Sequence, residues 1–138
     1  MELQKQLMEY GYEYCVTSNG EAKQNHLLFA SRYPFEVLPS SYQREKNKER
    51  WLESKLTQQD LHILGIHIPT SKDKQGKQDF WIEVNDFARK NINNKAIILG
   101  DYNTGLSEDG QGVPFYGMLD LGWIDTWRYT HGNFSGYS

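Results

Sequence analysis

Two apolar segments of this chain end abruptly in polar side chains, and this feature limits the folds that the chain can adopt. Segment 97–103 (IILGDYN) starts with three apolar residues and ends in a glycine, a carboxylate and a carboxamide. Segment 61–69 (LHILGIHIP) has the same pattern and presents His67 shortly before a proline. Such runs are typical of buried strands that end at the rim of a sheet, where open α/β sheets bind ligands. We therefore expect two strands that direct polar groups toward one end of a sheet.

The stretch between these strands predicts a helix. From about residue 76 to residue 91, five apolar residues follow one stripe of a helix: Phe80, Trp81, Val84, Phe87 and Ala88. A strand, a helix and a second strand make a crossover that usually joins parallel neighbours. The two motif strands should therefore pair in parallel.

The other segments predict a mixed order of helices and strands. Short helices are expected at 3–10, closed by Gly11, and at 113–121, closed by Gly122. Strands are expected at 12–17, 26–31, 51–56 and, after the second of these helices, at 123–128. A turn at 58–60 should join the strand at 51–56 to the first motif strand. The fold class is therefore α/β, or α+β.

Composition indicates one domain and excludes some function classes. The chain has 138 residues, a hydrophobic fraction of 38% and a net charge of −3, so it lacks the broad positive charge typical of nucleic-acid-binding domains. Any phosphate must be bound by local groups. A lone Cys15 excludes an intrachain disulfide within these residues, and from their pattern we expect neither a transmembrane segment nor a signal peptide. We expect a cytoplasmic protein.

Neither polar strand end is specific by itself. Asp and Asn after a strand often form turns or cap a helix, and a lone histidine is more often structural. Their order is more informative, with the motif SRYP at 31–34 upstream and WIDTWR at 123–128 downstream. In this order the motifs resemble the endonuclease/exonuclease/phosphatase superfamily, which includes exonuclease III-like repair nucleases, pancreatic-type deoxyribonucleases, sphingomyelinases and inositol-polyphosphate phosphatases. The resemblance runs from about residue 3 to residue 130.

The resemblance implies a four-layer αββα sandwich, with mixed sheets flanked by helices, and hydrolysis of phosphoesters by metal-assisted attack of water. In such enzymes the Asp of a Gly-Asp-x-Asn motif orients or deprotonates the water, and the Asn binds the phosphoryl oxygens. Asp101 and Asn103 match these positions. His67 stands where the family carries Tyr or His, and it could donate a hydrogen bond to phosphate or protonate the leaving oxygen.

The resemblance also implies parts that residues 1–138 lack. Family members begin with strands that carry an Asn and a Gln-Glu pair, whose glutamate is the principal Mg²⁺ ligand, and they end in a Ser-Asp-His motif. We therefore expect a single truncated domain. Asp101 and Asn103 should bind Mg²⁺ or Mn²⁺ only weakly, because Mg²⁺ prefers six oxygen ligands in near-octahedral geometry. The isolated chain should then have little or no hydrolase activity.

Arg32 is a further candidate for substrate binding. It closes a strand near the expected site and could contact a phosphate, although a surface arginine more commonly covers apolar area. Asp125 and Arg128 are expected to form an ion pair or a cap rather than to take part in chemistry. The tryptophans should lie in the core: Trp51, Trp81, Trp123 and Trp127.

Two function classes remain open. The first is a metal-dependent phosphoesterase, nuclease or phosphatase, whose substrate could be DNA, a phospholipid or a sugar phosphate. The second is a non-catalytic binding module that keeps the family fold and pairs with another chain. Part of a sandwich would leave apolar sheet faces uncovered, so self-association is expected.

Overall fold

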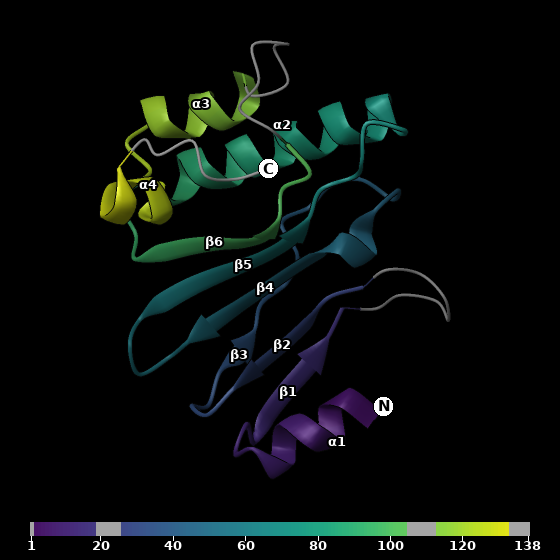
Figure 1. The fold of residues 1–138 in the computed structure, drawn as a ribbon, viewed down its shortest axis with the longest axis vertical. Coiled ribbons are helices and arrows are strands. Elements are labelled where there is room, and N and C mark those ends of the chain that lie inside the picture. Colours follow the sequence, from purple (N-terminus) through teal and green to yellow (C-terminus); the bar gives the residue numbers. More distant parts are fainter. Residues whose placement is uncertain (1, 19–25, 105–112, 133–138) are drawn as a thin grey trace.

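A computed structural model describes residues 2–18, 26–104 and 113–132, which form two sheets between helices (Figure 1). The elements are α1 (Glu2–Glu9), β1 (Tyr14–Thr17), β2 (Leu28–Ser31), β3 (Glu36–Val37), the 3-10 helix η1 (Lys48–Arg50), β4 (Trp51–Leu56), β5 (Leu61–His67), α2 (Lys74–Asn91), β6 (Ala96–Asp101), α3 (Val113–Asp120) and α4 (Thr126–His131). None of the helices in these ranges is long and apolar enough to cross a membrane.

The elements stack in four layers, which confirms the predicted α/β sandwich. Figure 1 shows α1 at the bottom, then the small sheet β1–β2, then the larger sheet, then α2 with α3 and α4. The larger sheet has the strand order β3-β4-β5-β6. Its first two pairings are antiparallel and β5 pairs with β6 in parallel, with α2 as the crossover. The predicted parallel pairing is therefore confirmed.

The main core lies between α2 and the larger sheet. Leu64, Ile66 and Ile68 are fully buried, as are Phe80 and Val84 on α2. Side chains alternate along a strand. Gly65 and His67, which lie between these three residues, therefore face the small sheet instead. In agreement, a Cβ placed on Gly65 would lie 3.7 Å from the Leu27 side chain. His67 belongs to this second face.

A buried carboxylate joins β4, β5 and the segment before β4. Glu53 is 4% exposed, and its Oε1 accepts hydrogen bonds from the indole of Trp51 at 2.7 Å and from the backbone of Ser41 at 2.6 Å. Its Oε2 lies 3.1 Å from Nε2 of His62, whose ring packs edge-on against Phe87. Glu53 is thus fully engaged in holding these elements together.

β6 is an edge strand of the larger sheet, and one of its faces is poorly covered. Ile98 packs against the core, whereas Ile97 and Leu99 on the opposite face are 42% and 45% exposed. The small sheet therefore does not cover this part of the larger one.

The prediction of a strand at 123–128 is wrong. Residues 123–125 belong to no helix or strand, and α4 begins at Thr126. Asp125 caps this helix, because its side chain accepts a hydrogen bond from the backbone of Arg128 at 3.2 Å, and the two side chains also form an ion pair. The expected cap is thus confirmed. Trp127, on the exposed face of α4, is 46% exposed, so its assignment to the core is wrong.

Candidate functional site

His67 and Asp101 lie opposite each other at the carboxyl ends of β5 and β6. The parallel register pairs them directly. Nε2 of His67 is 3.8 Å from Oδ2 of Asp101, and the two side chains are 22% and 60% exposed. An imidazole and a carboxylate are therefore held side by side, with access to solvent, at the end of the sheet where α/β folds bind ligands.

Gly100 explains how β6 comes this close to β5. Its φ is +142°, and a Cβ at this position would lie 1.9 Å from the carbonyl oxygen of Ile66. Only glycine fits such a backbone and such an approach. The next residue, Asp101, is tied to the residue that follows β5, because the backbone N–H of Ile68 donates to the carbonyl of Asp101 at 2.8 Å. The position of Asp101 therefore depends on Gly100.

Asn103 is fixed in a turn directly after β6. Its backbone N–H donates to Oδ1 of Asp101 at 2.9 Å, and its side-chain amide donates to the carbonyl of Ile68 at 2.8 Å. Its φ is +44°, in the left-handed region that asparagine tolerates better than most residues. The turn that a carboxylate often makes after a strand is thus present, and it gathers Asp101, Asn103 and His67 at one place.

Helix α2 anchors this turn at two points. Nζ of Lys77 donates to the carbonyl of Asn103 at 2.5 Å, and the indole of Trp81 donates to Oγ1 of Thr104 at 3.2 Å. The two anchors are one helical turn apart, on the same face of α2. Sequence reasoning missed Lys77, because a lysine on a helix usually faces solvent. Its spacing from Trp81 is the signal that could have indicated its direction.

Tyr102 supports the turn from the other side. Its hydroxyl donates to the carbonyl of Ile98 at 3.1 Å, and burial, aided by the nearby carboxylate of Asp125, raises the pKa of Tyr102 to about 12. The phenol therefore keeps its proton near neutral pH and remains a donor. Beside it, β6, α3 and the start of α4 line a cavity of about 410 Å³.

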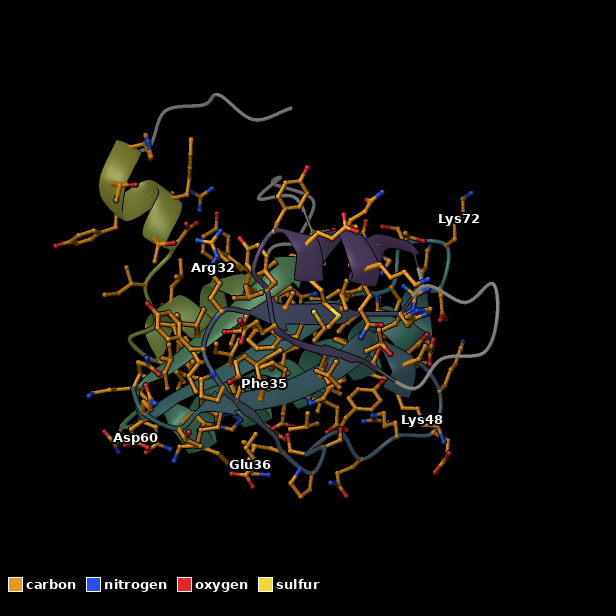
Figure 2. All side chains as sticks on the ribbon, turned by 90° about the horizontal axis from the view of Figure 1, so that it is seen from below. Arg32, Phe35, Glu36, Lys48, Asp60 and Lys72 are labelled. Atoms are coloured by element: carbon orange, nitrogen blue, oxygen red, sulfur yellow. The ribbon has the colours of Figure 1, made fainter. Side chains whose placement is uncertain are left out.

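The structure does not bring Arg32 to the other three candidates. Its guanidinium contacts the carbonyl of Tyr10 at 3.4 Å and lies 4.9 Å from the ring centre of Tyr12. Figure 2 shows Arg32 left of the centre of the molecule and Lys72, in the loop that follows β5, toward the upper right. Arg32 thus lies far from the carboxyl ends of β5 and β6.

Comparison with solved structures gives an informative likeness. No protein-family model matches the chain, and no curated protein matches it. Among solved structures, an AP endonuclease from Archaeoglobus fulgidus superposes with a TM-score of 0.78 at 18% sequence identity. The superposition covers 94% of this chain and 58% of that chain. The chain has an AP-endonuclease-like fold. At this identity the likeness confirms the expected nuclease-like fold, whereas the roles of individual residues remain predictions.

Within the AP-endonuclease-like fold, the described residues fit a divalent cation only in part. Asp101 offers a carboxylate and Asn103 offers an amide oxygen, the hard donors that Mg²⁺ prefers. Across residues 2–18, 26–104 and 113–132, however, no group of three His, Cys, Asp or Glu side chains is placed to hold a metal ion. Mg²⁺ takes six ligands, so these residues do not by themselves make a complete site.

Proposed function

We propose that this chain carries part of the active site of a phosphoesterase of the nuclease type, with His67, Asp101 and Asn103 as its functional groups. The observation that carries the proposal is the parallel register, which sets His67 against Asp101 while the same turn holds Asn103. The AP-endonuclease-like fold supports it, because it is the fold of an enzyme that cleaves phosphoesters.

Each of the three side chains has a chemical role in this proposal. Asp101 accepts a proton from the attacking water as the new P–O bond forms. Asn103 donates hydrogen bonds to the phosphoryl oxygens, where negative charge develops. His67 donates a hydrogen bond or a proton to the leaving oxygen as its bond to phosphorus breaks. Mg²⁺ or Mn²⁺, when bound, would neutralise phosphoryl charge, and Asp101 and Asn103 are the described residues that could contact it.

DNA is the substrate that we favour. The similar solved structure is an endonuclease, which acts on nucleic acid rather than on a phospholipid or a sugar phosphate. His67, in place of the tyrosine of exonuclease III-like enzymes, instead favours the deoxyribonuclease, sphingomyelinase and phosphatase branches. Deoxyribonuclease-type cleavage satisfies both observations.

Inorganic phosphate should bind between His67 and Asn103. We expect ¹H–¹⁵N spectra of the chain, titrated with phosphate in the presence of Mg²⁺, to shift at residues 101–104 and at the His67 ring. His67→Gln or Asn103→Ala should weaken binding about tenfold each, since a hydrogen bond to a charged group contributes about 1.5–3 kcal/mol. His62→Gln is the matched control, because His62 lies on the same strand but faces α2.

Equal phosphate affinity in all these variants would contradict the proposed site. Hydrolysis provides a separate measurement, with duplex DNA containing an abasic site as substrate. The partial metal site leads us to expect little turnover by the 138-residue chain. Mg²⁺-dependent cleavage that Asp101→Ala abolishes would show that this expectation of inactivity is wrong, and it would support the proposed function.

A non-catalytic binding module is the second candidate, and the exposed face of β6 favours it. An edge strand with exposed apolar side chains is prone to association. We expect the chain to sediment as a dimer or larger species at high micromolar concentration, and Ile97→Lys with Leu99→Lys should make it monomeric. Ile82→Lys, at an exposed apolar position on α2, should leave association unchanged. A strictly monomeric wild-type chain would count against this candidate.

A further inference from the structure

Lys77 is an unusual lysine, because it is almost entirely buried. It lies in the first turns of α2 and is 8% exposed. Lysine is rarely buried to this extent unless its charge is paired. In the part of the chain that the structure describes, no carboxylate lies within ion-pair distance of its amino group, and the partner of that group is the carbonyl of Asn103. The charge is therefore directed at the backbone of the candidate site.

The contact from Lys77 completes the restraint of Asn103. The backbone N–H of Asn103 is held by Asp101, and its side-chain amide is held by the carbonyl of Ile68. The carbonyl of Asn103 is the remaining polar group of this residue's backbone, and Lys77 binds it. Because φ of Asn103 is +44°, an uncommon backbone conformation, such restraints are needed to keep the residue in one orientation.

We propose that Lys77 is a positioning residue for phosphate recognition, whose ammonium group holds the Asn103 backbone so that the Asn103 carboxamide stays beside His67 and Asp101. The inference rests on the proposed function, because that proposal makes phosphate the ligand of Asn103. Lys77 contacts a backbone carbonyl, so it acts through Asn103 rather than on the reacting atoms.

The test compares Lys77→Met, which keeps the apolar stem, with Lys77→Arg, which keeps a charged donor. Lys74→Met is the control. Lys74 is exposed, and its replacement removes the same charge from the same end of α2. The first readout is the side-chain amide signal of Asn103, assigned by its loss in Asn103→Asp. The second is the affinity for inorganic phosphate, followed at residues 101–104.

We expect Lys77→Met to shift or broaden the Asn103 side-chain signal, to leave signals of β1 and β2 in place, and to weaken phosphate binding about tenfold. Lys77→Arg should restore most of the affinity, and Lys74→Met should resemble the wild type. An unchanged Asn103 signal in a folded Lys77→Met variant would overturn the inference.

Three further outcomes are informative, and the last two separate this inference from the proposed function. If Lys77→Met does not fold, the ¹⁵Nζ signal of the Lys77 ammonium in the wild-type chain is measured instead. The protons of a hydrogen-bonded ammonium exchange slowly with water, whereas those of a solvated one exchange fast. Fast exchange would overturn the inference. If the wild-type chain binds no phosphate at any site residue, the proposed function fails and the phosphate role of Lys77 fails with it. A wild-type chain that binds phosphate while Lys77→Met binds it equally well overturns the role of Lys77 alone.

Discussion

Replacement of Gly100 by alanine is expected to destabilise the protein by about 3–5 kcal/mol and to displace Asp101 from His67. The new Cβ would lie 1.9 Å from the backbone oxygen of Ile66, at a residue whose φ is +142°. Neither problem can be relieved by a side-chain movement, because the obstructing atom belongs to the backbone of a fully buried residue. Urea denaturation measures the loss of stability.

Gly65→Ala is the matched control for this experiment. Gly65 lies on the neighbouring strand, and an added Cβ there would make only ordinary contacts at 3.6 Å or more. We expect a change in the free energy of unfolding below about 1 kcal/mol. If Gly100→Ala unfolds at the same urea concentration as Gly65→Ala, the close approach of β6 to β5 is not what makes glycine necessary before Asp101.

Replacement of Glu53 by leucine is expected to cost about 3–5 kcal/mol, since it breaks a buried charged network by removing one partner. The indole N–H of Trp51 and the backbone N–H of Ser41 would both lose their acceptor in the interior, and His62 would lose its partner. Leucine has about the right volume, so the loss reports on hydrogen bonding rather than on a cavity. Chemical denaturation at neutral pH measures it.

Glu53→Gln separates hydrogen bonding from charge at the same position. Glutamine keeps an acceptor for Trp51 and Ser41, and its amide can donate to His62 in the other tautomer. We expect this variant to lose about 1 kcal/mol. Equal losses for leucine and glutamine would mean that the negative charge, rather than the accepted hydrogen bonds, holds β4 to β5.

The elements with clear periodicity were predicted correctly from the sequence. The prediction failed where the same residues could start either a strand or a helix. The apolar runs and the helical stripe of α2 placed the parallel crossover correctly, because two apolar runs separated by an amphipathic helix leave few alternatives. At 123–128, the tryptophan, isoleucine and threonine residues favour a strand. The structure instead starts a helix there, because the side chain of Asp125 satisfies the first turn. A local hydrogen bond thus prevailed over the strand preference of these residue types.

The candidate site was predictable where it depends on strand ends and not where it depends on the direction of a side chain. His67 and Asp101 follow from two parallel strands that end together. Arg32 also closes a strand, but β2 ends at the opposite side of the molecule, which the sequence does not reveal. Lys77 could not be assigned, since whether a long side chain turns inward depends on the acceptor that the fold places there.

The parallel crossover makes the candidate site a product of one cooperative folding unit. Both strand ends and the supporting lysine come from the contiguous segment 61–104, and α2 is the connection between the two strands. Parallel pairing of this kind forms late, because the entropy cost of loop closure comes before the strand contacts that offset it. The amides of Ile68 and Asn103, which are bound to Asp101, should therefore become protected from hydrogen exchange together. Fraying of the small sheet would leave this protection intact.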